Sequence, residues 1–144
     1  MSLDLRKAFD TVNHQILLRK LELLGVRGIC HSWFVSYLKN REQFVKIGKV
    51  ESTKQSIQWG VPQGSILGPT LFLVYVNSIS KLKLKSKIKL YADDTILVYS
   101  DVSVNTIKEN IKNDLNIVEQ WLCSHKLSLN IKKSSYMFIY SHKI

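Results

Sequence analysis

The stretch KIKLYADDTILVY, residues 87–99, places two short runs of apolar and β-branched residues on either side of Ala92, Asp93 and Asp94. Neither run is interrupted by Gly or Pro, so the stretch predicts a tight β-hairpin with both aspartates at its tip. Neighbouring carboxylates repel each other, and this arrangement costs stability unless a divalent cation lies between them. Asp is also a common turn residue, so the pair alone is compatible with a plain solvated turn.

Length and composition limit what surrounds this hairpin. The 144 residues are 45% hydrophobic, which is enough for one core and too short for two ordinary domains, so one domain spanning residues 1–144 is predicted. An excess of 21 Lys and Arg over 11 Asp and Glu gives a net charge of +10, which favours a polyanionic partner such as nucleic acid. Cys30 and Cys123 are too far apart in sequence to encode a zinc site or a disulfide framework.

The longest apolar stretch, residues 66–76, is too short to span a bilayer. The sequence therefore predicts a soluble intracellular protein with no membrane partner, and leaves open whether it resides in the nucleus or the cytoplasm.

Periodicity and turn residues predict the other elements. Residues 2–6 are expected to form a strand, and Asp10 or Asn13 to cap a helix that ends before Gly25. A helix over 29–38 is expected next, followed by β-type pieces over 43–50 and 53–58 around a turn at Gly48-Lys49. A loop over 60–64 then leads to a helix from Pro69 to about Ser80 and to the central hairpin. After the hairpin, we expect a strand over 135–140, preceded by an amphipathic helix whose apolar residues are Val104, Ile107, Ile111, Leu115, Val118 and Leu122. This order favours an α+β layer fold.

Asp4 is a third candidate carboxylate because it ends the first predicted strand and could face the hairpin tip from a neighbouring strand. Its alternative role is that of an early helix-cap acid. Together, Asp4 and Asp93 would supply one carboxylate from each of two adjacent strands. Such hard oxygen ligands suit two magnesium ions held about 4 Å apart.

Four stretches, taken in order, resemble the palm motifs of reverse transcriptases, particularly those of non-LTR (LINE-like) retrotransposons. They are DLRKAFDTVNH at residues 4–14, GVPQGSILGP at 60–69, YADD at 91–94 and LSLN at 127–130. The resemblance runs from Leu3 to about Tyr140. It implies a polymerase palm, that is, a ferredoxin/RRM-like antiparallel sheet with helices on one face. It also implies an RNA-directed DNA polymerase that adds dNTPs to a DNA primer on an RNA template.

The same resemblance assigns roles to individual residues. It implies that Asp4 and Asp93 ligate two Mg²⁺ ions, with Mn²⁺ as a possible substitute, and that Asp94 and the carbonyl of Leu5 support them. It implies that Phe9 lies under the sugar of the incoming nucleotide, where its ring would clash with a 2′-hydroxyl. The alternative for Phe9 is a core aromatic at the start of a helix.

Gln63 and Gly64 match the substrate-binding loop of the family, although a helix-entry loop with a solvated Gln63 would explain them as well. The resemblance implies that Lys133 matches a lysine that assists protonation of pyrophosphate, but residues 131–134 read Ile-Lys-Lys-Ser where the family has Pro-x-Lys-Thr. Residues 135–144 resemble the start of a primer-grip hairpin.

Lysines alternate with other residues just before the hairpin, at positions Lys81, Lys83, Lys85, Lys87 and Lys89. In an extended segment they would share one face. That face is either a template-backbone contact or an ordinary solvated strand.

The family also has a fingers region before the palm and a thumb after it, and both are expected to be truncated from this chain. We therefore expect missing segments or neighbouring domains of a longer polyprotein as partners. The alternative function is that of a catalytically inactive or domesticated palm remnant, which acts only in nucleic-acid or protein binding. A cyclase or viral RNA-polymerase palm is a third possibility, which Phe9 and the lack of a Gly-Gly-acid loop argue against.

Overall fold

A computed structural model describes residues 1–139 and shows a mixed α/β chain with antiparallel sheets and four α-helices in that range. The elements are β1 (Ser2–Leu3), η1 (Ala8–Thr11), α1 (His14–Leu23), α2 (Gly28–Leu38), β2 (Arg41–Gln43), β3 (Lys46–Ile47), β4 (Val50–Glu51), β5 (Gln55–Ile57), α3 (Leu67–Val76), η2 (Asn77–Lys81), β6 (Lys87–Tyr91), β7 (Asp94–Val98) and α4 (Val104–Ser124).

Backbone contacts divide the chain into two compact units. Met1–Arg6 joins the chain from Ser78 onward in the first unit, and Lys7–Asn77 makes the second. That the whole chain is a single palm domain stays a prediction. None of the helices in the described range is both long and apolar enough to cross a membrane.

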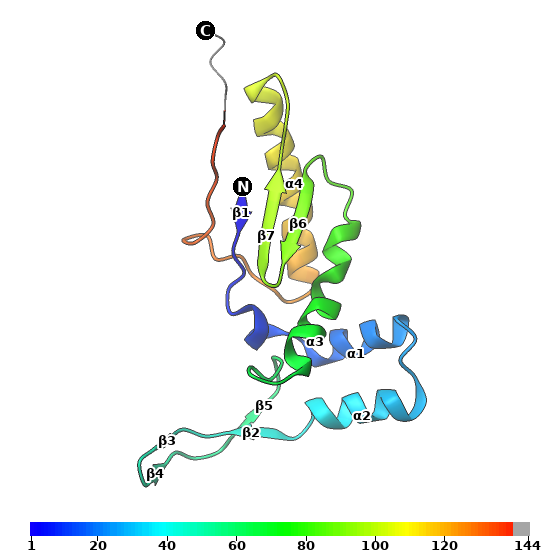
Figure 1. Cartoon of the computed structure of the whole chain (residues 1–144), viewed down its shortest axis with the longest axis vertical. Coiled ribbons are helices and arrows are strands. Elements are labelled where there is room, and N and C mark those ends of the chain that lie inside the picture. The colour runs from blue at the N-terminus through cyan, green and yellow to red at the C-terminus, as the bar shows by residue number, and fades with distance from the viewer. Residues whose placement is uncertain (140–144) are drawn as a thin grey trace. The chain divides into compact units, whose positions relative to one another are not determined.

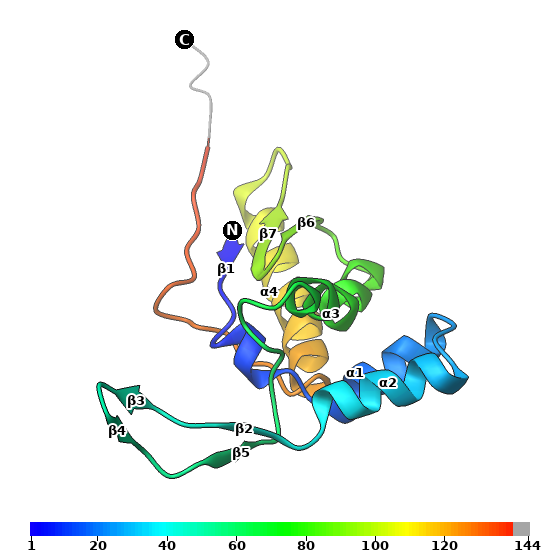
Figure 2. The same cartoon turned by 60° about the horizontal axis from the view of Figure 1, so that its bottom comes forward.

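The first unit is built on a three-stranded antiparallel sheet in the order β1-β7-β6. Helix α4 lies behind the β6–β7 hairpin in both Figure 1 and Figure 2. Leu3, Leu97 and Val118 are almost fully buried, so the sheet and the helix each contribute to this core. The predicted hairpin and the predicted amphipathic helix are confirmed. Ser103 caps α4 by accepting a hydrogen bond from the N–H of Thr106.

One buried carboxylate ties α4 to the chain that leads into β6. Asp114 is 1% exposed, and its two oxygens accept hydrogen bonds from the N–H groups of Lys85 (2.9 Å) and Ser86 (2.8 Å). Burial alone would raise the pKa of Asp114, but these hydrogen bonds outweigh it and hold the pKa below its ordinary value. The ionised carboxylate of Asp114 therefore helps to hold α4 against the segment that leads into β6.

Two strand predictions in the first unit are wrong in their extent. The strand expected over residues 2–6 ends at Leu3, because the backbone of Asp4 and Arg6 turns to the segment around Leu129 and because Lys7 adopts a positive φ of 48°. The strand expected over 135–140 is reduced to one backbone pair between Ser135 and Ser2. The next residues, 136–139, form no strand, and Tyr140 lies outside the described residues.

In the second unit, α1 packs against α2 and α3. The N-cap of α1 is Asn13 and not Asp10, because the Asn13 side chain accepts a hydrogen bond from the N–H of Ile16 at 3.0 Å. The predicted stop at Gly25 is confirmed by its φ of +94°. Leu24 is 63% exposed because it lies beyond the last turn of α1.

The other elements of this unit agree with the predictions except in their bounds. Helix α3 begins two residues before Pro69 and ends at Val76, and the 3-10 helix η2 begins at the next residue. The turn at Gly48-Lys49 is confirmed, since β3 and β4 pair on either side of it. The two arms on either side of this turn are nonetheless each divided into two short strands. β3 and β4 pair next to the turn, whereas β2 and β5 pair in a separate two-stranded sheet.

Candidate functional site

The register of the first sheet brings two of the predicted carboxylates to neighbouring positions. Ser2 pairs with Ile96 and Leu3 with Thr95, so Asp4 and Asp94 each lie one residue beyond the last pair of β1 with β7. Leu3 and Thr95 are 1% and 4% exposed and point into the core. Because side chains alternate along a strand, Asp94 belongs to the opposite face of the sheet, away from α4.

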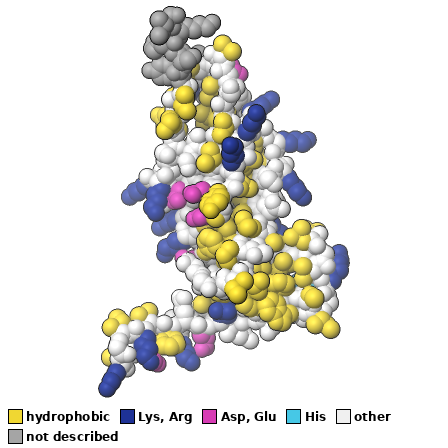
Figure 3. All heavy atoms as spheres, in the orientation of Figure 1, with side chains coloured by type: hydrophobic (Ala, Val, Ile, Leu, Met, Phe, Trp, Pro, Cys, Tyr) yellow, Lys and Arg dark blue, Asp and Glu magenta, His cyan; other side chains and the backbone are white. Residues whose placement is uncertain are grey.

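The hairpin carries Asp93 in its turn. Tyr91 pairs with Asp94, which leaves Ala92 and Asp93 as a two-residue connection. Ala92 has a φ of +52°, a conformation that residues with side chains seldom adopt outside sites that constrain them. Acidic side chains are visible among the basic and apolar ones on the face of the molecule drawn in Figure 3. The predicted hairpin with a carboxylate tip is thus confirmed.

The segment after α4 holds the backbone of Asp4 from its other side. The carbonyl of Asp4 accepts a hydrogen bond from the N–H of Asn130 at 2.8 Å, and its N–H donates to Oγ of Ser134 at 3.2 Å. The N–H of Arg6 donates to the carbonyl of Ser128 at 2.9 Å. The LSLN stretch therefore packs directly beside Asp4. Sequence reasoning missed Ser134, whose contact depends on tertiary structure.

The backbone of Leu5 faces away from the segment that follows α4. In the antiparallel bridge between Leu5 and Leu129, the hydrogen bonds run through the neighbouring residues, so the N–H and C=O of Leu5 point away from Leu129.

The donor atoms fit a hard divalent cation, since all are carboxylate or carbonyl oxygens. Among residues 1–139, however, no three or more His, Cys, Asp or Glu side chains are grouped closely enough to hold a metal ion. The structure therefore aligns Asp4, Asp93 and Asp94 along one sheet end without gathering them into a ligand cluster.

Phe9 belongs to the second unit. Its ring stacks on Phe72 with 4.3 Å between the ring centroids, and Phe72 is fully buried. The carbonyl of Phe9 accepts a hydrogen bond from the N–H of Val61 at 2.9 Å. Phe9 itself is half-buried, so one part of the ring is anchored in the core and another remains accessible.

The loop over residues 60–64 is pinned to the segment that follows Phe9. Gly60 donates its N–H to the carbonyl of Val12 at 2.8 Å, and a Cβ on Gly60 would lie 2.9 Å from Cα of Asp10. Nε2 of Gln63 donates to Oδ1 of Asp10 at 2.7 Å, so Gln63 has a protein partner. Gly64 has a φ of +77°, which favours glycine. Sequence reasoning considered Asp10 only as a cap and missed this contact.

The segment that carries the five alternating lysines, residues 81–89, is only partly extended. All five lysines are exposed, but Lys81 ends a 3-10 helix and a bend at Lys85 separates it from β6. The predicted single face is therefore wrong for the first three lysines. Lys87 and Lys89 pair across the sheet with Val98 and Ile96 and share the face of Asp94. Lys133 is exposed in the turn after Asn130.

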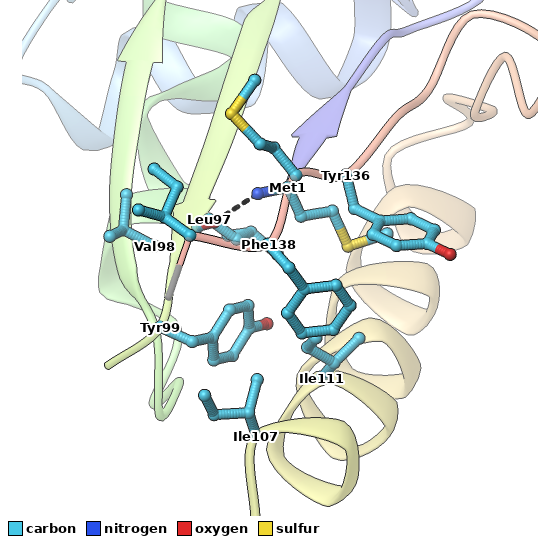
Figure 4. A pocket seen from close by; sticks show the side chains of 10 residues that line it. Met1, Leu97, Val98, Tyr99, Ile107, Ile111, Tyr136 and Phe138 are labelled. Atoms are coloured by element: carbon cyan, nitrogen blue, oxygen red, sulfur yellow. Dashed lines mark hydrogen bonds between the residues drawn. The ribbon is translucent and has the colours of Figure 1, made fainter. Parts of the chain in front are cut away.

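An apolar cavity of 270 Å³ lies in the first unit, at the end of β7 away from the turn. Figure 4 shows Tyr99 facing Ile107, Ile111 and Phe138 across it, while the amino group of Met1 donates to the carbonyl of Leu97 at 2.9 Å. Among residues 1–139, no carboxylate lines this cavity, so it is separate from the aspartates at the hairpin turn.

Comparison with known proteins identifies the family. The family described as "Reverse transcriptase (RNA-dependent DNA polymerase)" matches residues 1–143. The chain is 30% identical over 138 residues to the RNA-directed DNA polymerase from mobile element jockey of Drosophila melanogaster, covering 91% of this chain and 15% of that protein. It is 28% identical to a Pol polyprotein from the type-1 retrotransposable element R2 of Popillia japonica, covering 93% of this chain and 20% of that protein.

The chain thus spans about one-fifth or less of the length of these relatives. The match nevertheless covers almost every residue on which the four motifs and the sheet of the first unit are built. This chain therefore belongs to the reverse transcriptase family, and its relatives are polymerases of non-LTR retrotransposons.

Proposed function

We propose that this chain is the palm of an RNA-directed DNA polymerase that transfers deoxynucleotides to the 3′ end of a DNA primer paired to an RNA template. The observation that carries the proposal is the pairing of β1 with β7, because Asp4 directly follows the last paired residue of β1, Asp94 begins β7 and Asp93 occupies the adjoining turn. Membership of the reverse transcriptase family supports the same reaction. In this proposal the sheet of the first unit is part of a ferredoxin-like palm.

Asp4 and Asp93 would hold two divalent cations, with Asp94 and the Leu5 carbonyl in support. Mg²⁺ is the proposed ion, and Mn²⁺ suits the same oxygen ligands. When bound, the ions would favour deprotonation of the primer hydroxyl and stabilise the charge on the leaving pyrophosphate. The chain supplies a fixed backbone: the pair of Leu3 with Thr95 holds the residues next to Asp4 and Asp94, and Asn130 and Ser134 restrain the backbone of Asp4.

The test is primer extension on an RNA template, with the chain, deoxynucleotides and Mg²⁺. We expect incorporation that follows the template sequence and stops when EDTA is added. Template-independent incorporation, or incorporation unaffected by EDTA, would contradict the proposal.

A palm that binds nucleic acid without catalysis is the second candidate, and the net charge of +10 favours it. If this second candidate is right, the chain would bind the RNA–DNA duplex stably under the same conditions and would not extend the primer.

We also propose that Phe9 excludes ribonucleotides, and that Gln63 and Gly64 line the nucleotide site. Replacing Phe9 by Ala removes the ring that would clash with a 2′-hydroxyl, so the preference for dNTP over rNTP is expected to fall by about tenfold or more. The ratio of kcat/KM for the two nucleotides measures this preference. Phe9→Tyr keeps the ring and should keep the preference. Unchanged sugar selectivity in Phe9→Ala would sink the assignment.

A further inference from the structure

Trp59 separates two hollows of the second unit. One cavity of 580 Å³ and another of 430 Å³ share only Ile57 and Trp59 among their lining residues. Both volumes are in the range of sites that hold a small molecule or one nucleotide. Trp59 is 48% exposed, so its indole is accessible although it forms part of a wall.

The backbone at Trp59 is held on both sides. Trp59 forms an antiparallel bridge with Asn13, and the next residue, Gly60, donates its N–H to the carbonyl of Val12 at 2.8 Å. Nε2 of His14 lies 2.7 Å from the carbonyl of the same glycine. These contacts give the exposed ring a fixed base, as an aromatic stacking platform requires.

The walls of the two cavities carry basic and amide side chains, which are the types of side chain that contact nucleic acid in other proteins. Lys7 and Arg41 line the larger cavity and Lys39 the smaller one. The guanidinium of Arg41 lies 5.6 Å from the ring centroid of Tyr37, which restrains it. Amide side chains, which can both donate and accept hydrogen bonds at base edges, also line the walls: Gln43 and Gln63 in one cavity, Asn40 and Gln58 in the other.

The two carboxylates of the larger cavity, Asp10 and Glu42, are already engaged. Asp10 accepts the hydrogen bond from Gln63, and Glu42 lies 3.8 Å from Nζ of Lys54. Asp10 keeps its negative charge, because Gln63 is neutral, but the three basic side chains outnumber it and leave positive charge to balance phosphate. An accessible tryptophan among amides and cations is the combination that binds single-stranded nucleic acid without sequence preference.

We propose that an unpaired base of the RNA template stacks on the indole of Trp59, while Lys7, Lys39 and Arg41 contact the adjoining phosphates. That the strand is a template rests on the proposed function. Stacking itself depends only on an unpaired base and an accessible ring.

The test measures binding of a fluorescein-labelled oligouridylate to the full chain by fluorescence anisotropy. Trp59→Ala should weaken binding by about tenfold, and Trp59→Phe should restore most of the affinity because a ring remains. Trp33→Ala is the matched control, since Trp33 is 51% exposed in the same unit and lines neither cavity. Its affinity should equal that of the wild type.

A second probe keeps the test informative even if Trp59→Ala fails to fold. An oligonucleotide of the same length with abasic sites should bind the wild-type chain about tenfold more weakly than oligouridylate. Equal affinity for the two strands, or equal affinity of Trp59→Ala and Trp33→Ala, would overturn the proposal. This assay involves no catalysis, so its result is independent of whether primer extension succeeds.

Discussion

Replacing Asp93 by Ala is expected to lower RNA-templated incorporation by a factor on the order of 10² to 10³. Asp93 lies in the two-residue turn of the β6–β7 hairpin, and β7 pairs with β1, which ends one residue before Asp4. Removing its carboxylate would take away one of the oxygen ligands proposed for the metal ions. The measurement is the rate of single-nucleotide addition to a labelled primer at saturating Mg²⁺.

The control for Asp93→Ala is Glu119→Gln, which removes a negative charge from an exposed position on α4. Its rate should match that of the wild type. The turn is closed by backbone pairing of Tyr91 with Asp94, so Asp93→Ala should keep the wild-type melting temperature within a few degrees. If Asp93→Ala extends the primer as fast as Glu119→Gln, Asp93 is not a catalytic residue.

Replacing Asp114 by Asn is expected to cost about 2 to 3 kcal/mol of unfolding free energy. Asp114 is buried, and each of its oxygens accepts one backbone N–H, from Lys85 and from Ser86. An amide of the same shape can accept only one of these hydrogen bonds and sets its own NH₂ against the other donor. Urea denaturation followed by circular dichroism gives the difference, with Glu119→Gln again as the control.

The Asp114 effect should depend on pH in a defined direction. Because the pKa of Asp114 is lowered in the folded chain, its stabilisation is fully present above the unfolded-state pKa of about 3.9 and is lost as the pH falls through the lower folded value. The difference in stability between wild type and Asp114→Asn should therefore shrink on acidification. A difference that stays constant from pH 7 to pH 2 would show that the charge of Asp114 is unimportant.

The parts of the fold that follow from local patterns were predictable. Residues 87–99 alternate in burial on both strands of the hairpin, and α4 follows its three-to-four spacing of apolar residues. Gly25 ends α1 because its positive φ favours glycine. These features depend on residues that are close in sequence, and therefore the sequence reports them directly.

The parts that depend on distant contacts were not predictable. Asp114 looks like an exposed helix residue until Lys85 and Ser86 supply the N–H groups that bury it. The sequence after Ser134 has the pattern of a strand, but among residues 135–139 only Ser135 pairs with β1. Likewise, no local pattern indicates that Gln63 donates to Asp10, since the pair is separated by 53 positions.

The central claim is that carboxylates from β1 and from the β6–β7 hairpin hold divalent metal together. It is tested most directly by titrating Mn²⁺ into the wild-type chain, Asp4→Asn and Glu119→Gln, with free Mn²⁺ measured by electron paramagnetic resonance. We predict that the wild type and Glu119→Gln bind Mn²⁺ alike and that Asp4→Asn binds it at least about tenfold more weakly. Equal Mn²⁺ affinity in all three proteins would contradict the claim.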